Sequence, residues 1–268
     1  MPYLIGFLIA LFIALTGVGA GTLTVPVLVL FLGVPAPLAV GIGLLFSAAV
    51  KLILVPTQIV HGNVAWRTLG YMLVGGVPGV LIGAFFLRHL MSAGSQNLLN
   101  ALLGAILVGT ASWQILYSFR PMRERREVRD RSRLLSLLMF PVGAEVGFSS
   151  AGAGALGSAA LLGLTALAPA QVVGTDIAFG FTLSLIGSGA HWFSQTSNPM
   201  LLLQLVAGGL AGAVGGTLLS TRVPRRPLRI ALWIWLLILG GQFLLNSYEA
   251  RGISPKQAAT RVQASPLR

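Results

Sequence analysis

The segment Thr16-Gly17-Val18-Gly19-Ala20-Gly21-Thr22 is a glycine-rich break in an otherwise continuous apolar run that extends from Leu4 to Leu32. Glycine lacks a Cβ atom, so such a cluster interrupts a helix or lets another group approach the backbone closely. The apolar pieces before and after the break have about 16 and 11 residues, too few to cross a hydrocarbon core of roughly 30 Å at about 1.5 Å per residue. The stretch therefore predicts a broken helix pair, either a hairpin or a re-entrant element.

A second break of the same kind lies at residues 149–154. An offset of 133 residues carries the first break onto the second, with Gly19 on Gly152 and Gly21 on Gly154. Without a gap, the same offset also aligns pairs of later glycines, namely Gly75 with Gly208, Gly79 with Gly212 and Gly83 with Gly216. One register held over this length indicates an internal duplication. We predict two halves, each built on a broken helix pair.

The composition indicates an integral membrane protein. Hydrophobic residues make up 55% of the 268 residues, charged residues 9%, and the mean hydropathy is +0.86. The apolar segments are long and do not alternate strictly, which favours helices over a membrane barrel. The chain has no cysteine, so it has no disulfide framework or thiolate chemistry. We therefore expect an all-α polytopic fold.

The apolar segments predict three transmembrane helices in each half after the broken pair. The expected long helices cover residues 38–60, 66–87, 98–117, 170–193, 200–220 and 228–247. The expected organisation is a first membrane repeat at 1–119, a basic linker at 120–133, a second repeat at 134–248 and a polar tail at 249–268. The N-terminus lacks the charged start of a secretory signal peptide, so we expect it to be part of the fold. The stripe of Gly75, Gly79 and Gly83 is typical of close helix packing.

The positive charges indicate a topology rather than a nucleic-acid partner. Of the 18 basic residues in a chain of net charge +12, seven arginines stand between Arg120 and Arg133. The positive-inside rule places this linker in the cytoplasm. If each broken pair re-enters, the basic cluster from Arg222 to Arg229 also becomes cytoplasmic. We therefore predict inverted repeats with both termini outside, although basic residues in the tail after Arg251 count against this orientation.

A few ionisable residues stand inside apolar segments, and these are the candidates for function. A charged group at this depth is costly, so each must face protein or water. Lys51, Glu145, Asp176 and His191 form this set. The alternatives are a structural ion pair for Lys51 and Asp176, backbone capping for Glu145 and a structural hydrogen bond for His191.

Helical spacing places several of these residues on two matching stripes. In the second half, the positions that share an arc of about 80° are Asp176, Gly180, Ser184, Gly187 and His191. The equivalent positions of the first half are Gly43, Ser47, Lys51, Leu54 and Gln58. If a two-fold axis in the membrane plane relates the halves, both stripes face one central cavity.

The two breaks are candidate anion sites. Their backbone N–H groups, together with helix N-termini expected at Thr22 and Ala155, would form a positive nest near the midplane. The residues that we assign to these nests are Gly17, Gly19, Gly21, Thr22, Ser150, Gly152 and Gly154. Tight packing is the alternative for these glycines. No Gly-Lys-Ser/Thr follows them, so they do not form a nucleotide-binding loop.

The chain resembles the TauE/SafE family of sulfite exporters. The resemblance rests on the segments Gly17–Pro26, Ala39–Gly41, His61–Trp66, Gly75–Gly83, Val173–Phe179 and Ser184–His191. It implies a prokaryotic plasma (inner) membrane transporter of sulfite, of sulfonates such as sulfoacetate, or of thiosulfate. The second copy has Ala159 where the first has Pro26, and serines where glycines would be expected in the break.

Three classes of function remain open. The leading hypothesis is a secondary transporter that binds its anion through the nests with Ser47, Lys51, Gln58, Ser184 and His191, and carries protons on Asp176 or Glu145. A channel, or a carrier of another small organic anion, is the alternative. An enzyme is the weakest hypothesis, because the sequence has no paired carboxylates, metal-ligand cluster or activated nucleophile. We expect no cofactor, metal or nucleic acid, and a homodimer is one option.

Overall fold

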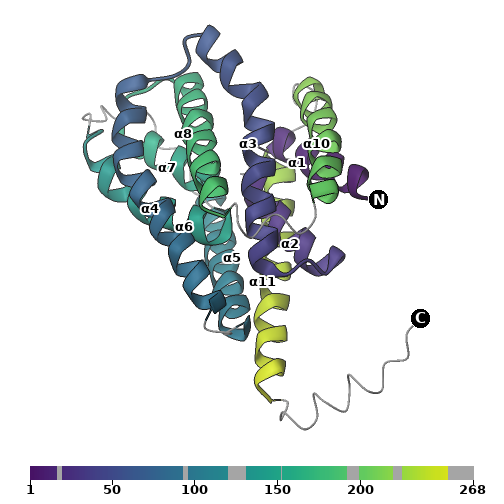
Figure 1. Ribbon diagram of the computed structural model, residues 1–268. Helices are drawn as coiled ribbons and strands as arrows, with labels where there is room; N and C mark the ends of the chain where they lie inside the picture. Colours follow the sequence, from purple (N-terminus) through teal and green to yellow (C-terminus); the bar gives the residue numbers. More distant parts are fainter. Residues whose placement is uncertain are drawn as a thin grey trace.

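The computed structural model describes residues 1–16, 20–92, 96–119, 131–151, 153–191, 199–219 and 225–252. All secondary structure in these residues is helical (Figure 1). The first half contains α1 (Pro2–Thr16), α2 (Ala20–Leu32), α3 (Ala36–Val60), α4 (Trp66–Ser92) and α5 (Gln96–Phe119). The second half contains α6 (Leu134–Ser149), α7 (Ala153–Leu164), α8 (Pro169–Ala190), α10 (Pro199–Leu219) and α11 (Arg225–Gly252).

Six of these helices are long and apolar enough to span a membrane, and they are the six that the sequence predicts: α3, α4, α5, α8, α10 and α11. The all-α polytopic fold is therefore confirmed. The starts of α7, α8 and α10 follow those of α2, α3 and α4 by the 133-residue offset. The internal repeat is thus present at the level of helix boundaries.

Several helix ends differ from the expected positions. The helices after the breaks begin at Ala20 and Ala153, so Gly21, Thr22 and Gly154 lie in the first turns of α2 and α7. The first four N–H groups of a helix have no partner within that helix, so these residues still belong to an N-terminus. At the other end, α7 stops at Leu164 and not near Ala168. Pro169 accounts for the extended conformation of Ala168, because a proline disfavours helical angles in the residue before it, but α7 already ends four residues earlier.

Helices α3 and α8 form the centre of the molecule. They are the most buried of the six long helices, and Figure 1 shows them side by side between α4 with α6 and α1 with α10. Their largest fully buried side chains include Phe46 and Phe179, which are equivalent under the repeat. Each ring fills space beside a glycine of a neighbouring long helix, Phe46 at Gly209 and Phe179 at Gly76. This contact between a phenylalanine and a glycine thus occurs in both halves.

Each broken helix packs against a glycine-rich helix of the opposite half. In α4, Gly75, Gly79 and Gly83 lie directly against the backbone carbonyl groups of Ser136, Phe140 and Ala144 in α6. The equivalent glycines of α10, Gly208 and Gly212, lie against the carbonyl groups of Tyr3 and Phe7 in α1. A Cβ atom at any of these positions would collide with backbone. The prediction that this stripe serves packing is confirmed.

Equivalent helices at the centre run in opposite directions. Gly187 of α8 faces Leu44 of α3, and Ser184 contacts Ser47, so later positions in one helix meet earlier positions in the other. Helices α5 and α11 show the same pattern, because Gly104 lies near Phe243 and Gly240 lies near Val108. Antiparallel packing of repeat-related helices agrees with a two-fold axis in the membrane plane. The inverted topology itself stays a prediction.

Candidate functional site

The two breaks approach each other near the centre of the bundle. Gly21, in the first turn of α2, lies directly against the backbone and hydroxyl oxygen of Ser150, which follows α6. A Cβ atom on Gly43 of α3 would lie 3.1 Å from the same Oγ. Two small residues from the first half therefore make room for the break of the second half.

Ser150 has an unusual backbone conformation. Its φ of 62° is the only positive φ of a non-glycine residue among the described residues, and its N–H donates to the carbonyl of Val146 at 2.8 Å. A non-glycine residue in this region is strained and needs support from its surroundings. Ser150 is 6% exposed, and its Oγ has no hydrogen-bond partner among the described residues. A buried hydroxyl in this state is ready to bind a polar ligand.

The polar stripes of α3 and α8 meet directly. Ser184 Oγ donates to Ser47 Oγ at 3.0 Å, and both side chains are buried. Lys51 follows Ser47 by one turn of α3, and Asp176 precedes Ser184 by two turns of α8. Because the two helices are antiparallel, both ionisable residues lie on the same side of the serine pair. The structure thus brings four of the predicted site residues to one interface.

Asp176 is buried with half of its carboxylate satisfied. It is 7% exposed, and Oδ2 accepts a hydrogen bond from Ser158 Oγ of α7 at 2.8 Å. Oδ1 lies against Gly157 and has no hydrogen-bond partner among the described residues. An incompletely satisfied carboxylate in the membrane is a candidate for taking up a proton or a cation.

Glu145 lies in α6, one turn before the second break. The side chain is half-buried, and its Oε1 is a buried atom without a hydrogen-bond partner among the described residues. Its backbone carbonyl accepts a hydrogen bond from Ser149 Oγ at 2.9 Å. Within the described part of the chain, Oε1 therefore does not cap the backbone, which was the structural alternative for this residue.

His191 and Gln58 lie at the ends of their helices. His191 caps α8 and is 5% exposed, with Nε2 3.0 Å from the carbonyl oxygen of Gly147 in α6. The Gln58 amide oxygen accepts a hydrogen bond from Asn63 Nδ2 at 3.0 Å, in the turn between α3 and α4. The first contact joins α8 to α6 and the second stabilises a local turn, and a role of either residue in substrate binding stays a prediction.

The remaining predicted residues divide into two groups. Thr22 is 2% exposed, and Gly154 is half-buried in the first turn of α7. Gly17, Gly19 and Gly152 lie outside the described residues. Of the residues assigned to the nests, the structure therefore describes Gly21, Thr22, Ser150 and Gly154.

Two residues at the site have no counterpart in the sequence-based predictions. Ser158 donates to Asp176, and Thr175 Oγ1 accepts a hydrogen bond from the N–H of Ala65 at 3.0 Å. Thr175 is fully buried and fixes the segment before α4 against α8. The repeat contained a signal for Ser158. At the positions equivalent to Ser158 and Asp176, the first half has the non-polar residues Val25 and Gly43, so both positions become polar together in the second half.

Comparison with known proteins agrees with this architecture. The profile of the family described as "Sulfite exporter TauE/SafE" matches residues 3–243, nearly the whole described chain. The chain belongs to the TauE/SafE family. The resemblance seen in the sequence is thereby confirmed.

Two relatives in Bacillus subtilis (strain 168) carry transporter names. The chain is 29% identical to the probable membrane transporter protein YjnA over 246 residues, which cover 88% of this chain and 96% of YjnA. It is 25% identical to the probable membrane transporter protein YtnM over 218 residues, which cover 76% of this chain and 71% of YtnM. No solved structure matches the chain significantly. This TauE/SafE protein is a multi-pass membrane transporter of the plasma membrane with a small-molecule substrate.

Proposed function

We propose that this TauE/SafE protein is a secondary transporter that exports sulfur-containing anions across the plasma membrane. Sulfite, sulfonates such as sulfoacetate, and thiosulfate are the proposed substrates. The family description supports sulfite as the first of these. We further propose that the protein moves its substrate without converting it chemically.

The observation that carries this proposal is the meeting of both breaks with the polar stripes at the bundle centre. Gly21 and Ser150 bring two helix ends together, and the pair of Ser47 and Ser184 lies between α3 and α8. Helix N-termini and a lysine supply positive potential for an anion. A small oxyanion held by hydroxyl and amide donors beside Lys51 fits these groups.

In this proposal, Asp176 carries the coupling proton. Its Oδ1 lacks a partner among the described residues, and Lys51 lies on the same side of the serine pair. Protonation would cancel the attraction between Asp176 and Lys51, so that Lys51 becomes available to the anion. Glu145 offers a second buried carboxyl oxygen close to the second break.

Transport by purified protein in liposomes tests the proposal. Vesicles loaded with unlabelled sulfite, sulfoacetate or thiosulfate should accumulate the same labelled anion from outside by counterflow, whereas vesicles loaded with chloride should not. Counterflow belongs to a carrier, so flux without trans-acceleration would identify a channel. If counterflow occurs only with carboxylates that lack sulfur, the protein is still a carrier, but of a different class of substrate.

A further inference from the structure

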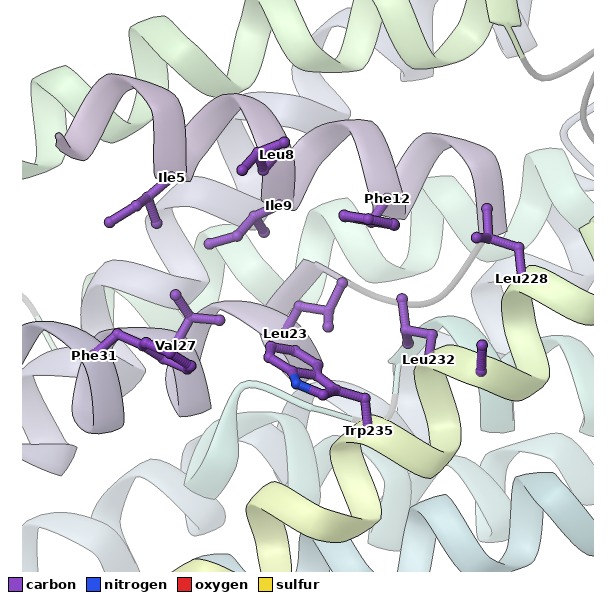
Figure 2. A pocket seen from close by; sticks show the side chains of 11 residues that line it. Ile5, Leu8, Ile9, Phe12, Leu23, Val27, Phe31, Leu228, Leu232 and Trp235 are labelled. Carbon is purple, nitrogen blue, oxygen red and sulfur yellow. The ribbon is translucent and has the colours of Figure 1, made fainter.

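An apolar groove lies on the side of the molecule, next to the first break. Helices α1, α2 and α11 enclose it, and its volume is about 480 Å³ (Figure 2). All of its lining side chains are hydrocarbon or aromatic. Figure 2 shows Ile5 and Phe31 at one end of the groove and Leu228 at the other, with Trp235 along one wall.

The groove opens to the outside of the bundle. Phe12 is 40% exposed and Phe31 is 66% exposed, and the rings of Phe31 and Trp235 stack with centroids 6.5 Å apart. In a membrane protein such an opening faces hydrocarbon and not water. Its elongated apolar lining suits an acyl chain.

One end of the groove carries positive charge. Arg229 directly follows the lining residue Leu228, and its Nε–H donates to the carbonyl of Thr16 at 3.2 Å. This bond holds the guanidinium at the end of α1. Arg225 and Arg226 begin α11 one turn earlier, and that first turn contains no acidic residue. The predicted topology places these arginines on the cytoplasmic side, where the leaflet is anionic.

Two of the equivalent positions in the other half carry different side chains. Under the 133-residue offset, Gln96 stands for Arg229 and Glu145 stands for Phe12. A cation and an aromatic wall are therefore replaced by a neutral amide and a carboxyl group. The features that would hold an anionic lipid occur together in one half only.

We propose that this groove binds one acyl chain of an anionic phospholipid, with the phosphate beside Arg229. The acyl chain lies between α1 and α11, against α2. Arg229 contacts Thr16 at the start of the first break, so the lipid site adjoins that break, but the proposal does not depend on the identity of the transported substrate.

Fluorescence of Trp235 gives a direct test. The chain has five tryptophans, so Trp66, Trp113, Trp192 and Trp233 are replaced by phenylalanine to leave Trp235 alone. The protein is placed in phosphatidylcholine vesicles that contain a fixed fraction of phosphatidylglycerol, and either lipid is brominated on its acyl chains. Bromine quenches tryptophan only at short range. We expect brominated phosphatidylglycerol to occupy the groove about fivefold more strongly than brominated phosphatidylcholine, as one arginine contributes roughly 1 kcal/mol toward an anionic lipid.

Three variants assign this preference to the groove. Arg229→Gln should abolish the preference for phosphatidylglycerol and leave quenching by both lipids. Ala231→Phe fills the groove and should weaken quenching by both. Ile234→Phe is the matched control on the same helix, because Ile234 is 48% exposed and does not line the groove. Equal quenching by the two lipids in the parent protein, or equal effects of Ala231→Phe and Ile234→Phe, would overturn the proposal.

Two further measurements do not require the single-tryptophan protein to fold, and they also test whether something other than a lipid occupies the groove. Native mass spectrometry of the otherwise unchanged protein should detect bound phosphatidylglycerol that Arg229→Gln and Ala231→Phe lose and Ile234→Phe keeps. Retention in all three variants contradicts the site. Because the chain has no cysteine, Ala231→Cys reports whether a second copy covers the groove. Efficient disulfide-linked dimers in membranes would replace the lipid by a homodimer contact.

Discussion

Lys51 supplies a positive charge to the interface between α3 and α8. If this charge binds the transported anion, Lys51→Met should raise the half-saturating concentration about 10- to 100-fold, as expected for loss of a hydrogen bond to a charged group of about 1.5–3 kcal/mol. Lys51→Arg keeps the charge and should retain much of the affinity. Counterflow in liposomes measures both variants, with size-exclusion profiles to check folding. Unchanged affinity in a well-folded Lys51→Met protein would remove Lys51 from the site.

Asp176 makes a separate prediction because its carboxylate can be neutralised without loss of shape. Asp176→Asn mimics the protonated side chain, and it should keep anion exchange between two compartments while it loses net flux driven by a pH gradient. Glu145→Gln tests the alternative carrier in the same two assays. The comparison requires the two assays in the same liposomes. Gradient-driven flux that survives in Asp176→Asn would assign proton coupling elsewhere, and loss of both activities would indicate a structural ion pair with Lys51.

Residue-level predictions from the sequence succeeded where helical spacing was enough. Helical spacing placed Ser47 and Ser184 on matching stripes of α3 and α8, and these hydroxyls are joined at 3.0 Å, whereas a cavity shared by the two stripes stays a prediction. The bond from Ser158 to Asp176 could not be predicted in the same way. The rotation of the short helix α7 depends on its tertiary neighbours, since its own apolar pattern has no clear face.

At the scale of helices, the glycines of α4 and α10 define the closest contacts. Gly212→Ala places a methyl group against the carbonyl of Phe7, and overpacking of this kind should destabilise the protein by about 1–3 kcal/mol. Gly215→Ala is the control on the same helix, because no described atom beyond the surrounding turns of its own helix lies within 4 Å of the position that its methyl group would take. It should leave the melting temperature unchanged or raise it, since alanine favours helix. Fluorescence-detected size exclusion after heating compares the two variants. Equal melting temperatures would show that α1 and α10 pack more loosely than the contact at Gly212 indicates.

The existence and order of the helices could be predicted, but their partners could not. Apolar length predicted all six long helices, but α8 ends at Ala190, before the expected end at residue 193. A glycine stripe predicts that some backbone comes close. It does not identify the partner, and nothing in α4 alone indicates that the partner is α6 from the other half. Such a choice depends on the whole assembly.

For the whole molecule, the distribution of arginines predicts that both termini are outside the cell. A reporter that fluoresces only in the cytoplasm, fused after Arg268, should therefore stay dark. The same reporter inserted in the linker between α5 and α6 should fluoresce and serves as the positive control. A bright fusion after Arg268 would contradict the inverted arrangement, because an even number of crossings would then separate the linker from the C-terminus.

The exchange of glycine contacts between the halves has a consequence for biosynthesis. Helix α4 is synthesised before α6, so its glycine face is without its packing partner when it enters the bilayer. Helix α1 lacks its partner α10 for even longer. Neither half can complete its packing alone. Residues 1–119 produced as a separate chain should therefore be degraded, and coexpression with residues 134–268 should restore a stable complex, as read by immunoblot of membrane fractions. Linking the halves in one polypeptide guarantees that each newly made first half finds its complement at equal abundance.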